Sequence, residues 1–306
     1  MDASNVDARR LGRIILTLMF GSHLSIAGGL HKALLEAERL GFGTVQVFTA
    51  SPRNWANGNK DPSSLIPKEV IEQWTSHRNR LQYECTVSHD SYLINLASPD
   101  DALRKKSIEL FSCELRRCAA LGITYLVTHP GAHVGQGDEA GLRQIIQSFD
   151  EIHDSIPADG VTTCLEITAG QGSSLGYRLE HLSTIIEGVK NSKRLGVCLD
   201  TAHLFAAGYD FRGRKYSKFI KQLDSIVGVE RVKVLHLNDS KKELGSRVDR
   251  HAHIGQGLIG LEGFRPFVRD SAFKNVPKIL ETPKEKHADG RDWDTVNLET
   301  LRSLMR

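Results

Sequence analysis

Short runs of apolar residues alternate along the chain with longer stretches in which apolar positions recur every three or four residues. Valine, isoleucine and leucine dominate the short runs, as expected of strands that are buried on both faces of a parallel sheet. The longer stretches have the period of amphipathic helices. Eight short runs are present, at residues 14–20, 44–48, 85–88, 124–128, 162–165, 195–199, 231–235 and 276–280.

The stretches between these runs predict helices with recognisable ends. One apolar stripe ends at Gly41, a residue that favours helix termination, and it consists of Leu30, Ala33, Leu34, Ala37 and Leu40. Similar stripes occur in residues 108–122 and 142–152. Eight βα units without a composition break or a Pro-rich linker predict a TIM (β/α)8 barrel. We expect one domain over residues 14–306, a flexible tail over residues 1–13, and an active site at the C-terminal face of the strands.

Composition narrows the function classes only slightly. A chain of 306 residues with 40% hydrophobic residues can bury a large core without disulfides. The formal net charge of +3 is too small for a strongly basic nucleic-acid-binding domain. If the protein binds DNA, the positive potential must be local, and bound metal ions could supply it.

The cysteines and the N-terminal region bear on the compartment. Five cysteines without a C-x-x-C pair indicate a reducing compartment and argue against a zinc ribbon. Cys164 and Cys198 lie in apolar runs and are expected in the core. Three arginines precede residues 14–20, but no small-residue cleavage site follows and seven residues are too few to span a bilayer. We therefore expect a cytoplasmic protein with no membrane segment.

Charged or imidazole side chains follow six consecutive apolar runs, where packing alone predicts neither. In a TIM barrel these positions converge at the C-terminal mouth, so the side chains would lie within a few ångströms of one another. Three of them are carboxylates, which repel each other when they share a site. A bound metal ion resolves that conflict. The six residues are His89, His129, Glu166, Asp200, His236 and Glu281.

Three further candidates lie in the loops beside these positions. His203 forms a D-x-x-H segment with Asp200, and Asp249 forms a D-x-H segment with His251. Closely spaced aspartate and histidine suit a divalent ion. The set of five histidines and four carboxylates is too large for one ion, so two or three ions are expected. Because all ligand atoms are nitrogen or oxygen, zinc or manganese is favoured, and three such ions would leave a net positive charge that attracts a phosphate.

The remaining histidines have different expected roles. His23 follows the first run, faces the mouth and is a candidate contact for a substrate phosphate. His133 and His253 lie close to the predicted ligands in sequence, and a structural role is favoured for both. Surface positions are expected for His31, His77, His153, His181 and His287.

Several segments that contain these residues are long and specific. They are GSHLSIAGG at 21–29, HDSYLINL at 89–96, HPGAH at 129–133, TAGQGSSLG at 168–176, CLDTAHLFAAGYD at 198–210, HLND at 236–239 and GSRVDRH at 245–251. Together they resemble endonuclease IV, the family of metal-dependent apurinic/apyrimidinic endonucleases, from about residue 20 to the C-terminus. The resemblance implies a TIM barrel with a trinuclear zinc centre, in which manganese could occupy one or more sites.

The resemblance also implies the chemistry of each site. Glu166 would bridge two ions and is the predicted catalytic residue. The three ions would be held by His89, His129 and Glu166, by Glu166, Asp200, His236 and Glu281, and by His203, Asp249 and His251. The implied reaction is hydrolysis 5′ to an abasic site in duplex DNA, which leaves a 3′-hydroxyl and a 5′-deoxyribose phosphate. A 3′-phosphodiesterase or 3′-phosphatase side activity is also implied.

DNA recognition is expected from loops at the mouth. The resemblance implies that Arg53, Asn54 and Tyr92 enter the duplex at the lesion while the abasic sugar is flipped into the pocket. For Trp55, in the same SPRNW segment, burial under the loop is favoured. The expected partner is duplex DNA with abasic sites, with no obligate protein partner and a monomeric enzyme. One departure is Ile167, where the family commonly has Asn after the bridging glutamate, and this exchange could alter a hydrogen bond beside the metal centre.

Two other functions are compatible with parts of the pattern. Related barrels that isomerise or epimerise sugars also place His, Glu and Asp at strand ends to hold one or two metal ions, and fold alone does not settle function. Such an isomerase needs neither the group of His203, Asp249 and His251 nor the Arg53 loop. A non-catalytic protein that binds damaged DNA or metal is the second alternative, and incision of an abasic duplex separates it from an enzyme.

Overall fold

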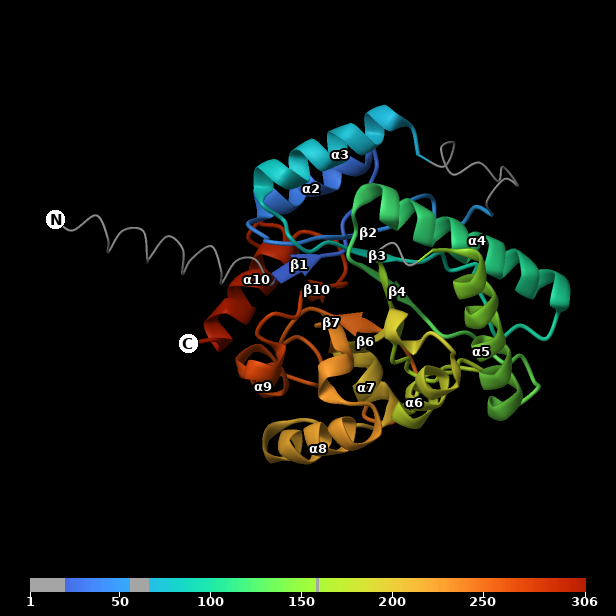
Figure 1. Cartoon of the computed structure of the whole chain (residues 1–306). Helices are drawn as coiled ribbons and strands as arrows, with labels where there is room; N and C mark the ends of the chain where they lie inside the picture. The colour runs from blue at the N-terminus through green and yellow to red at the C-terminus, as the bar shows by residue number, and fades with distance from the viewer. Residues whose placement is uncertain (1–19, 56–65, 158–159) are drawn as a thin grey trace.

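The centre of the molecule is a ring of parallel strands, and the computed structural model describes residues 20–55, 66–157 and 160–306 (Figure 1). Within these residues one sheet of eight strands runs in the order β1-β10-β7-β6-β5-β4-β3-β2. Its two outer strands meet through a parallel bridge between His23 and Gln46, next to a 2.9 Å hydrogen bond from Leu24 N to Gln46 O. The sheet therefore closes, and the predicted TIM barrel is confirmed. The strands are β1 (Phe20–Ser22), β2 (Gln46–Val47), β3 (Val87–His89), β4 (Tyr125–Thr128), β5 (Thr162–Glu166), β6 (Leu195–Asp200), β7 (Val232–His236) and β10 (Lys278–Leu280).

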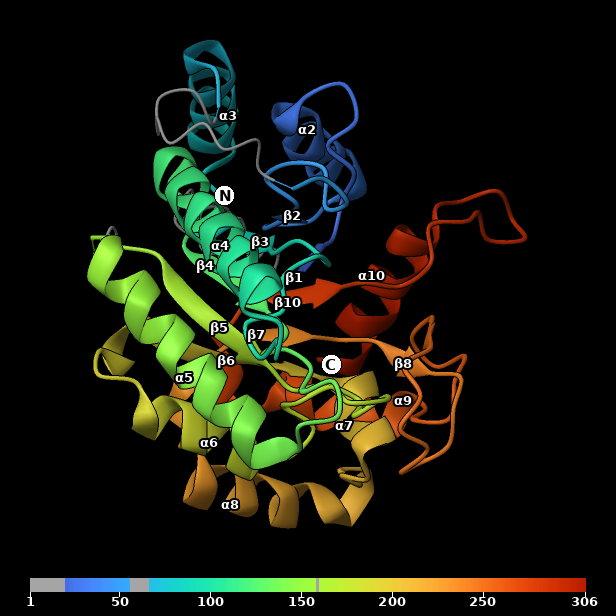
Figure 2. The same ribbon diagram turned by 90° about the vertical axis from the view of Figure 1, so that its right-hand side faces the viewer.

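Helices surround this ring and connect its strands (Figures 1 and 2). In the described residues they are α2 (Leu30–Leu40), α3 (Lys68–Leu81), α4 (Asp101–Leu121), α5 (Asp138–Ser155), α6 (Leu179–Gly188), α7 (Thr201–Ala207), α8 (Tyr216–Ile226), α9 (Leu261–Arg269) and α10 (Trp293–Leu304). Short 3-10 turns are η2 (Ser192–Arg194), η3 (Gly213–Lys215), η4 (Val229–Arg231) and η5 (Ser271–Phe273).

The ends of the helices follow the predicted signals. Gly41 ends α2 with a left-handed φ of 79°, a conformation that costs glycine little because it has no Cβ. At the start of α4 the side chain of Asp100 accepts a 3.0 Å hydrogen bond from Leu103 N. The predicted apolar stripe of α2 is buried along its whole length, so this helix packs against the sheet as expected.

The interior of the barrel holds a small apolar cluster that is separate from the larger core between sheet and helices. Six strands each contribute one fully buried side chain to it, and Cys164 and Cys198 are core residues as predicted. Each member lies two positions before one of the six predicted ligands at the strand ends. Since side chains alternate between the two faces of a strand, each predicted ligand points to the same side as this apolar layer. The six residues are Val87, Val127, Cys164, Cys198, Val234 and Ile279.

One feature was not predicted from the hydrophobic pattern. The segment 237–260, which follows β7, contains a two-stranded antiparallel sheet, β8 (Asp239–Ser240) with β9 (His251–Ala252). The buried carboxylate of Asp239 accepts hydrogen bonds from Gly255 N and Ile259 N, which gives this segment local order that periodicity does not reveal. Figure 2 shows β8 and the chain before α10 on the same side of the barrel.

The first predicted run, 14–20, overlaps β1 only at Phe20, and its other residues lie outside the described part of the chain, as does the predicted tail over residues 1–13. The domain boundary at residue 14 therefore stays a prediction. Among the described helices, none has both the length and the apolar character that crossing a membrane requires.

Candidate metal centre and catalytic pocket

The nine predicted metal ligands meet at the C-terminal mouth of the barrel. At the centre lies Glu166, whose side chain is fully buried at the end of β5. Its Oε2 atom is 3.2 Å from His89 Nε2 and 3.4 Å from His129 Nε2. Its Oε1 atom is 3.1 Å from His236 Nδ1. The two oxygens of one carboxylate therefore face different histidines, as a residue shared between two ions must.

A second group forms around the other side of Glu166. The Nδ1 atom of His236 is 3.1 Å from Glu281 Oε2 and 3.8 Å from Asp200 Oδ2. Donor atoms of Glu166, Asp200, His236 and Glu281 all lie within 4.8 Å of one another, and the same holds for His89, His129 and Glu166. These are the first two groups that the resemblance implies.

The third group joins β9, the loop before it and α7. The carboxylate of Asp249 lies between two imidazoles, with Oδ2 3.2 Å from His203 Nε2 and Oδ1 3.1 Å from His251 Nε2. Among the described residues, the buried His251 Nε2 atom has no partner in hydrogen-bond geometry, despite this short distance to Asp249. Such an atom fits a site whose nitrogen and carboxylate oxygens point at a common cation rather than at each other.

The hydrogen bonds of the outer imidazole nitrogens also support a metal site. His89 Nδ1 donates to Asp90 O at 3.0 Å, His203 Nδ1 to Ile167 O at 2.9 Å, and His251 Nδ1 to Glu281 O at 3.2 Å. A proton held at the outer nitrogen leaves the inner nitrogen with a lone pair that faces the carboxylates. This tautomer is the one that binds a metal ion.

Burial and charge oppose each other in this cluster. Burial alone raises the pKa of Glu166, but His236 and His129 beside it hold the pKa well below its usual range. Burial lowers the pKa of His251, yet Asp200 and Asp249 raise it to about 9. The negative charge of the carboxylates therefore stabilises positive charge in this buried site. Divalent ions supply that charge, so the residues fit a metal centre.

A thiol also lies beside the cluster. The Sγ atom of Cys198 is within 4.8 Å of donor atoms of Glu166 and His236. Burial raises the pKa of Cys198 to about 12, which disfavours the thiolate form that binds metal ions. The expectation of a centre built from nitrogen and oxygen is consistent with this.

Comparison with known proteins identifies the family. Residues 34–304 match the family model described as "Xylose isomerase-like TIM barrel". The "Probable endonuclease 4" of Chloroflexus aurantiacus is 47% identical over 290 residues, which is 94% of this chain and 98% of that protein. The chain belongs to the endonuclease IV family. The predicted resemblance is therefore confirmed.

Solved structures agree with this membership. Endonuclease IV from Thermus thermophilus is 36% identical, with a TM-score of 0.78 over 94% of this chain and 98% of that one. A D-tagatose 3-epimerase-like protein is 21% identical, with a TM-score of 0.68 over 94% and 97%. At that identity the likeness to the epimerase shows the barrel fold alone.

The residues expected to touch DNA in an endonuclease IV lie around a catalytic pocket of about 310 Å³. Tyr92 lines this pocket, is 68% exposed and packs edge-on against Phe48 at 5.3 Å between ring centres. Arg53 and Asn54 are exposed in the neighbouring loop. A 2.7 Å hydrogen bond from Ser91 Oγ to Pro52 O ties that loop to the segment after His89.

Trp55 is 36% exposed, so its expected burial under the loop is wrong. His23 is half-buried and lines the catalytic pocket, and no described residue offers a hydrogen-bond partner to its Nε2 atom. Its predicted contact with a substrate phosphate stays a prediction.

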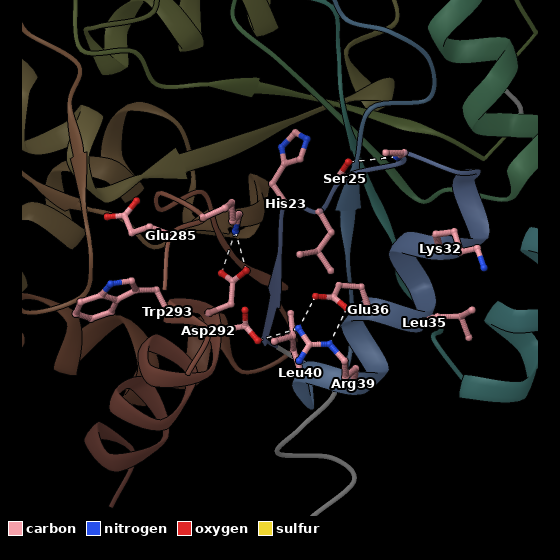
Figure 3. Close-up of a pocket in the computed structure, with 14 residues that line it drawn as sticks. His23, Ser25, Lys32, Leu35, Glu36, Arg39, Leu40, Glu285, Asp292 and Trp293 are labelled. Atoms are coloured by element: carbon pink, nitrogen blue, oxygen red, sulfur yellow. Dashed lines mark hydrogen bonds and ion pairs between the residues drawn. The ribbon is translucent and has the colours of Figure 1, made fainter. Parts of the chain in front are cut away.

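A second groove adjoins the catalytic pocket between α2 and the segment before α10 (Figure 3). It has a volume of about 650 Å³ and shares His23 and Lys284 with the catalytic pocket. Most of its charges pair within the groove: Figure 3 shows Arg39 between Glu36 and Asp292, with shortest distances of 2.6 and 2.9 Å. Paired charges of both signs make this groove a poor anion site.

Sequence reasoning missed several side chains that support the centre. Asn238 donates to Asp200 Oδ2 at 2.6 Å and accepts from Glu281 N at 2.8 Å, which restrains two predicted ligands. Lys284 donates to Ser22 Oγ at 2.6 Å at the edge of the pocket. Of these, only Asn238 carried a signal, because it lies in the HLND segment that matches the family.

The other histidines divide as follows. His181 is only 5% exposed and pairs with Asp138 at 3.4 Å, so its predicted surface position is wrong. Its place in the first turn of α6, under the loop after β5, explains the burial. His253 is buried and stacks on Trp293 at 3.8 Å, in keeping with a structural role. Half-buried positions are taken by His31, His77, His133, His153 and His287.

Proposed function

We propose that this chain is a metal-dependent endonuclease that hydrolyses the phosphodiester bond 5′ to abasic sites in duplex DNA. The products would be a 3′-hydroxyl and a 5′-deoxyribose phosphate. The observation that carries the proposal is the meeting of nine nitrogen- and oxygen-bearing side chains in one mouth, including the group of His203, Asp249 and His251. A sugar isomerase with one or two metal ions has no need of that third group.

Three zinc ions per chain are proposed, with manganese as a substitute at one or more sites. They would be held by His89, His129 and Glu166, by Glu166, Asp200, His236 and Glu281, and by His203, Asp249 and His251. Bound divalent ions lower the pKa of a water molecule and neutralise negative charge on phosphate oxygens. The role proposed for Glu166 is to connect the first two groups, because its oxygens face different histidines.

Recognition of the lesion is assigned to the loops. Arg53, Asn54 and Tyr92 are exposed beside the pocket and can enter a duplex where a base is missing. Extrusion of the abasic sugar costs least there because pairing is already lost. His23 is proposed to donate a hydrogen bond to a phosphate oxygen. Contacts with phosphates imply that binding weakens as the salt concentration rises.

The same centre accounts for the proposed side activity at 3′ ends. A phosphate or phosphodiester at a 3′ terminus presents the same kind of bond to the same groups, so 3′-phosphodiesterase and 3′-phosphatase reactions are expected. We further propose that the enzyme acts as a monomer on chromosomal DNA in the cytoplasm, without an obligate protein partner. A single chain carries all nine proposed ligands.

The test is incision of a labelled duplex with one abasic site by purified protein, with and without a chelator. The expected product has a 3′-hydroxyl that a DNA polymerase extends, and the chelator prevents its formation. An undamaged duplex of the same sequence is the substrate control. Cleavage on the 3′ side of the lesion, or chelator-resistant cleavage, would contradict the proposal.

A further inference from the structure

Gln46 lies inside the barrel, where a polar side chain needs a specific reason. It is fully buried on β2, which lies two strands from β10, the strand before Glu281, and three strands from β7, the strand that ends at His236. Three histidines of the centre use main-chain carbonyls as acceptors for their outer nitrogens. His236 differs, because its outer Nε2 atom lies 2.8 Å from the side-chain Oε1 of Gln46. Its orientation therefore depends on a side chain that a mutation can remove.

The orientation of the Gln46 amide is determined by its neighbours. Its Nε2 group donates to Glu281 Oε1 at 2.6 Å. If the amide were rotated by 180°, its oxygen would face the carboxylate oxygen at that short distance, and the two would repel. The Oε1 atom must therefore face His236. An amide oxygen only accepts, so His236 carries its proton on Nε2.

This tautomer leaves the Nδ1 lone pair of His236 directed at the predicted metal site. Nδ1 lies 3.1 Å from Glu166 Oε1 and 3.1 Å from Glu281 Oε2. The second hydrogen of the Gln46 amide is available to His23, whose Nδ1 atom is 3.0 Å from Gln46 Nε2. The same His23 nitrogen lies 3.3 Å from Glu281 Oε1, so His23 joins the hydrogen-bond cluster of Gln46 and Glu281.

We propose that Gln46 is a positioning residue of the metal centre, whose one amide fixes the tautomer of His236 and restrains the carboxylate of Glu281. The inference rests on the proposed function, since it takes His236 and Glu281 as metal ligands. Gln46 itself binds neither metal nor substrate. Its role is to present the ligand atoms in the orientation that a divalent ion needs.

Two variants of Gln46 separate positioning from packing. Gln46→Leu keeps the approximate volume but removes both the acceptor and the donors. Gln46→Glu keeps an acceptor for His236 and removes the donors to Glu281 and His23. The matched control is Gln144→Leu, which makes the same exchange at a half-buried glutamine on α5.

The first readout is the zinc affinity of the full chain, measured by competition with a chromophoric chelator. We expect Gln46→Leu to bind one zinc ion about ten- to a hundredfold more weakly, while the remaining ions bind as in the wild type. At subsaturating zinc, kcat for an abasic duplex should fall by a similar factor while KM changes little. Gln144→Leu should match the wild type in both measurements.

The second readout is the nitrogen-15 spectrum of the imidazoles in the zinc-free protein at alkaline pH, where the neutral ring has one proton and no metal ion fixes its position. In the wild type and in Gln46→Glu, His236 should show a protonated Nε2, whereas Gln46→Leu should lose this fixed tautomer. Unchanged zinc affinity in Gln46→Leu, an equal loss in Gln144→Leu, or loss of the tautomer in Gln46→Glu overturns the proposal. If Gln46→Leu fails to fold, the spectrum of Gln46→Glu still decides the matter. Wild-type protein that binds no zinc and incises no DNA would instead refute the proposed function.

Discussion

Replacement of Glu166 by glutamine should abolish incision and leave the barrel folded. The exchange keeps the size of a fully buried side chain but removes its charge. The carboxylate is proposed to face divalent ions, and two unit charges about 3 Å apart interact by about 5 kcal/mol at an effective dielectric constant of about 20. Losing one such interaction from the transition state slows the reaction by more than about a thousandfold, because 1.36 kcal/mol corresponds to a factor of ten.

The assay is single-turnover incision of an abasic duplex at saturating zinc, with circular dichroism as the check of folding. Glu114→Gln is the matched control, because Glu114 is also buried but contacts Thr49 and Arg117 rather than the nine predicted ligands. We expect the control to incise within about threefold of the wild type, which corresponds to less than about 1 kcal/mol of barrier. A folded Glu166→Gln protein with near-normal rates would refute the reasoning about this carboxylate.

Three further predictions concern other parts of the molecule. Arg53→Ala should weaken binding of the abasic duplex by about tenfold or more, because a charge-assisted hydrogen bond of about 1.5–3 kcal/mol is lost. The metal content should not change, and loss of metal in this variant would show that the loop is misassigned. His251→Ala should remove one of the three ions and lower incision by at least about a hundredfold, and elemental analysis that still finds three ions would contradict the third group. Burial raises the pKa of Glu114 from 4.5 to about 7. Between these pH values the folded chain therefore binds more protons than the unfolded chain. The stabilisation from this group is complete below pH 4.5 and is lost as the pH rises through 7. Urea denaturation should therefore show Glu114→Gln gaining about 3 kcal/mol relative to the wild type between pH 4.5 and pH 8. Parallel pH profiles would contradict this.

The fold could be predicted from the sequence because the barrel repeats one simple pattern. Apolar runs gave the strands β2 to β7 and β10 to within two or three residues, and glycines such as Gly41 gave helix ends. The pair β8 and β9 could not be found in this way, because two-residue strands are too short to show a period. The conformation of this segment depends on hydrogen bonds from Gly255 N and Ile259 N to Asp239, which are long-range tertiary contacts.

The candidate site was predictable for a related reason. Six predicted ligands follow a buried residue by two positions, so the alternation of side chains along a strand aims them into one mouth. Gln46 was missed because a single polar residue inside an apolar run has no partner that the sequence identifies. Its partners His236 and Glu281 are 190 and 235 residues away along the chain. His181 was misassigned because a helical period alone does not tell which loop covers the first turn.

The most direct test of the central claim is the number of divalent ions bound to purified, active protein, measured by elemental analysis together with incision of an abasic duplex. The account predicts about three zinc or manganese ions per chain, and loss of incision when they are removed. Full activity in protein that retains no such ion would contradict it.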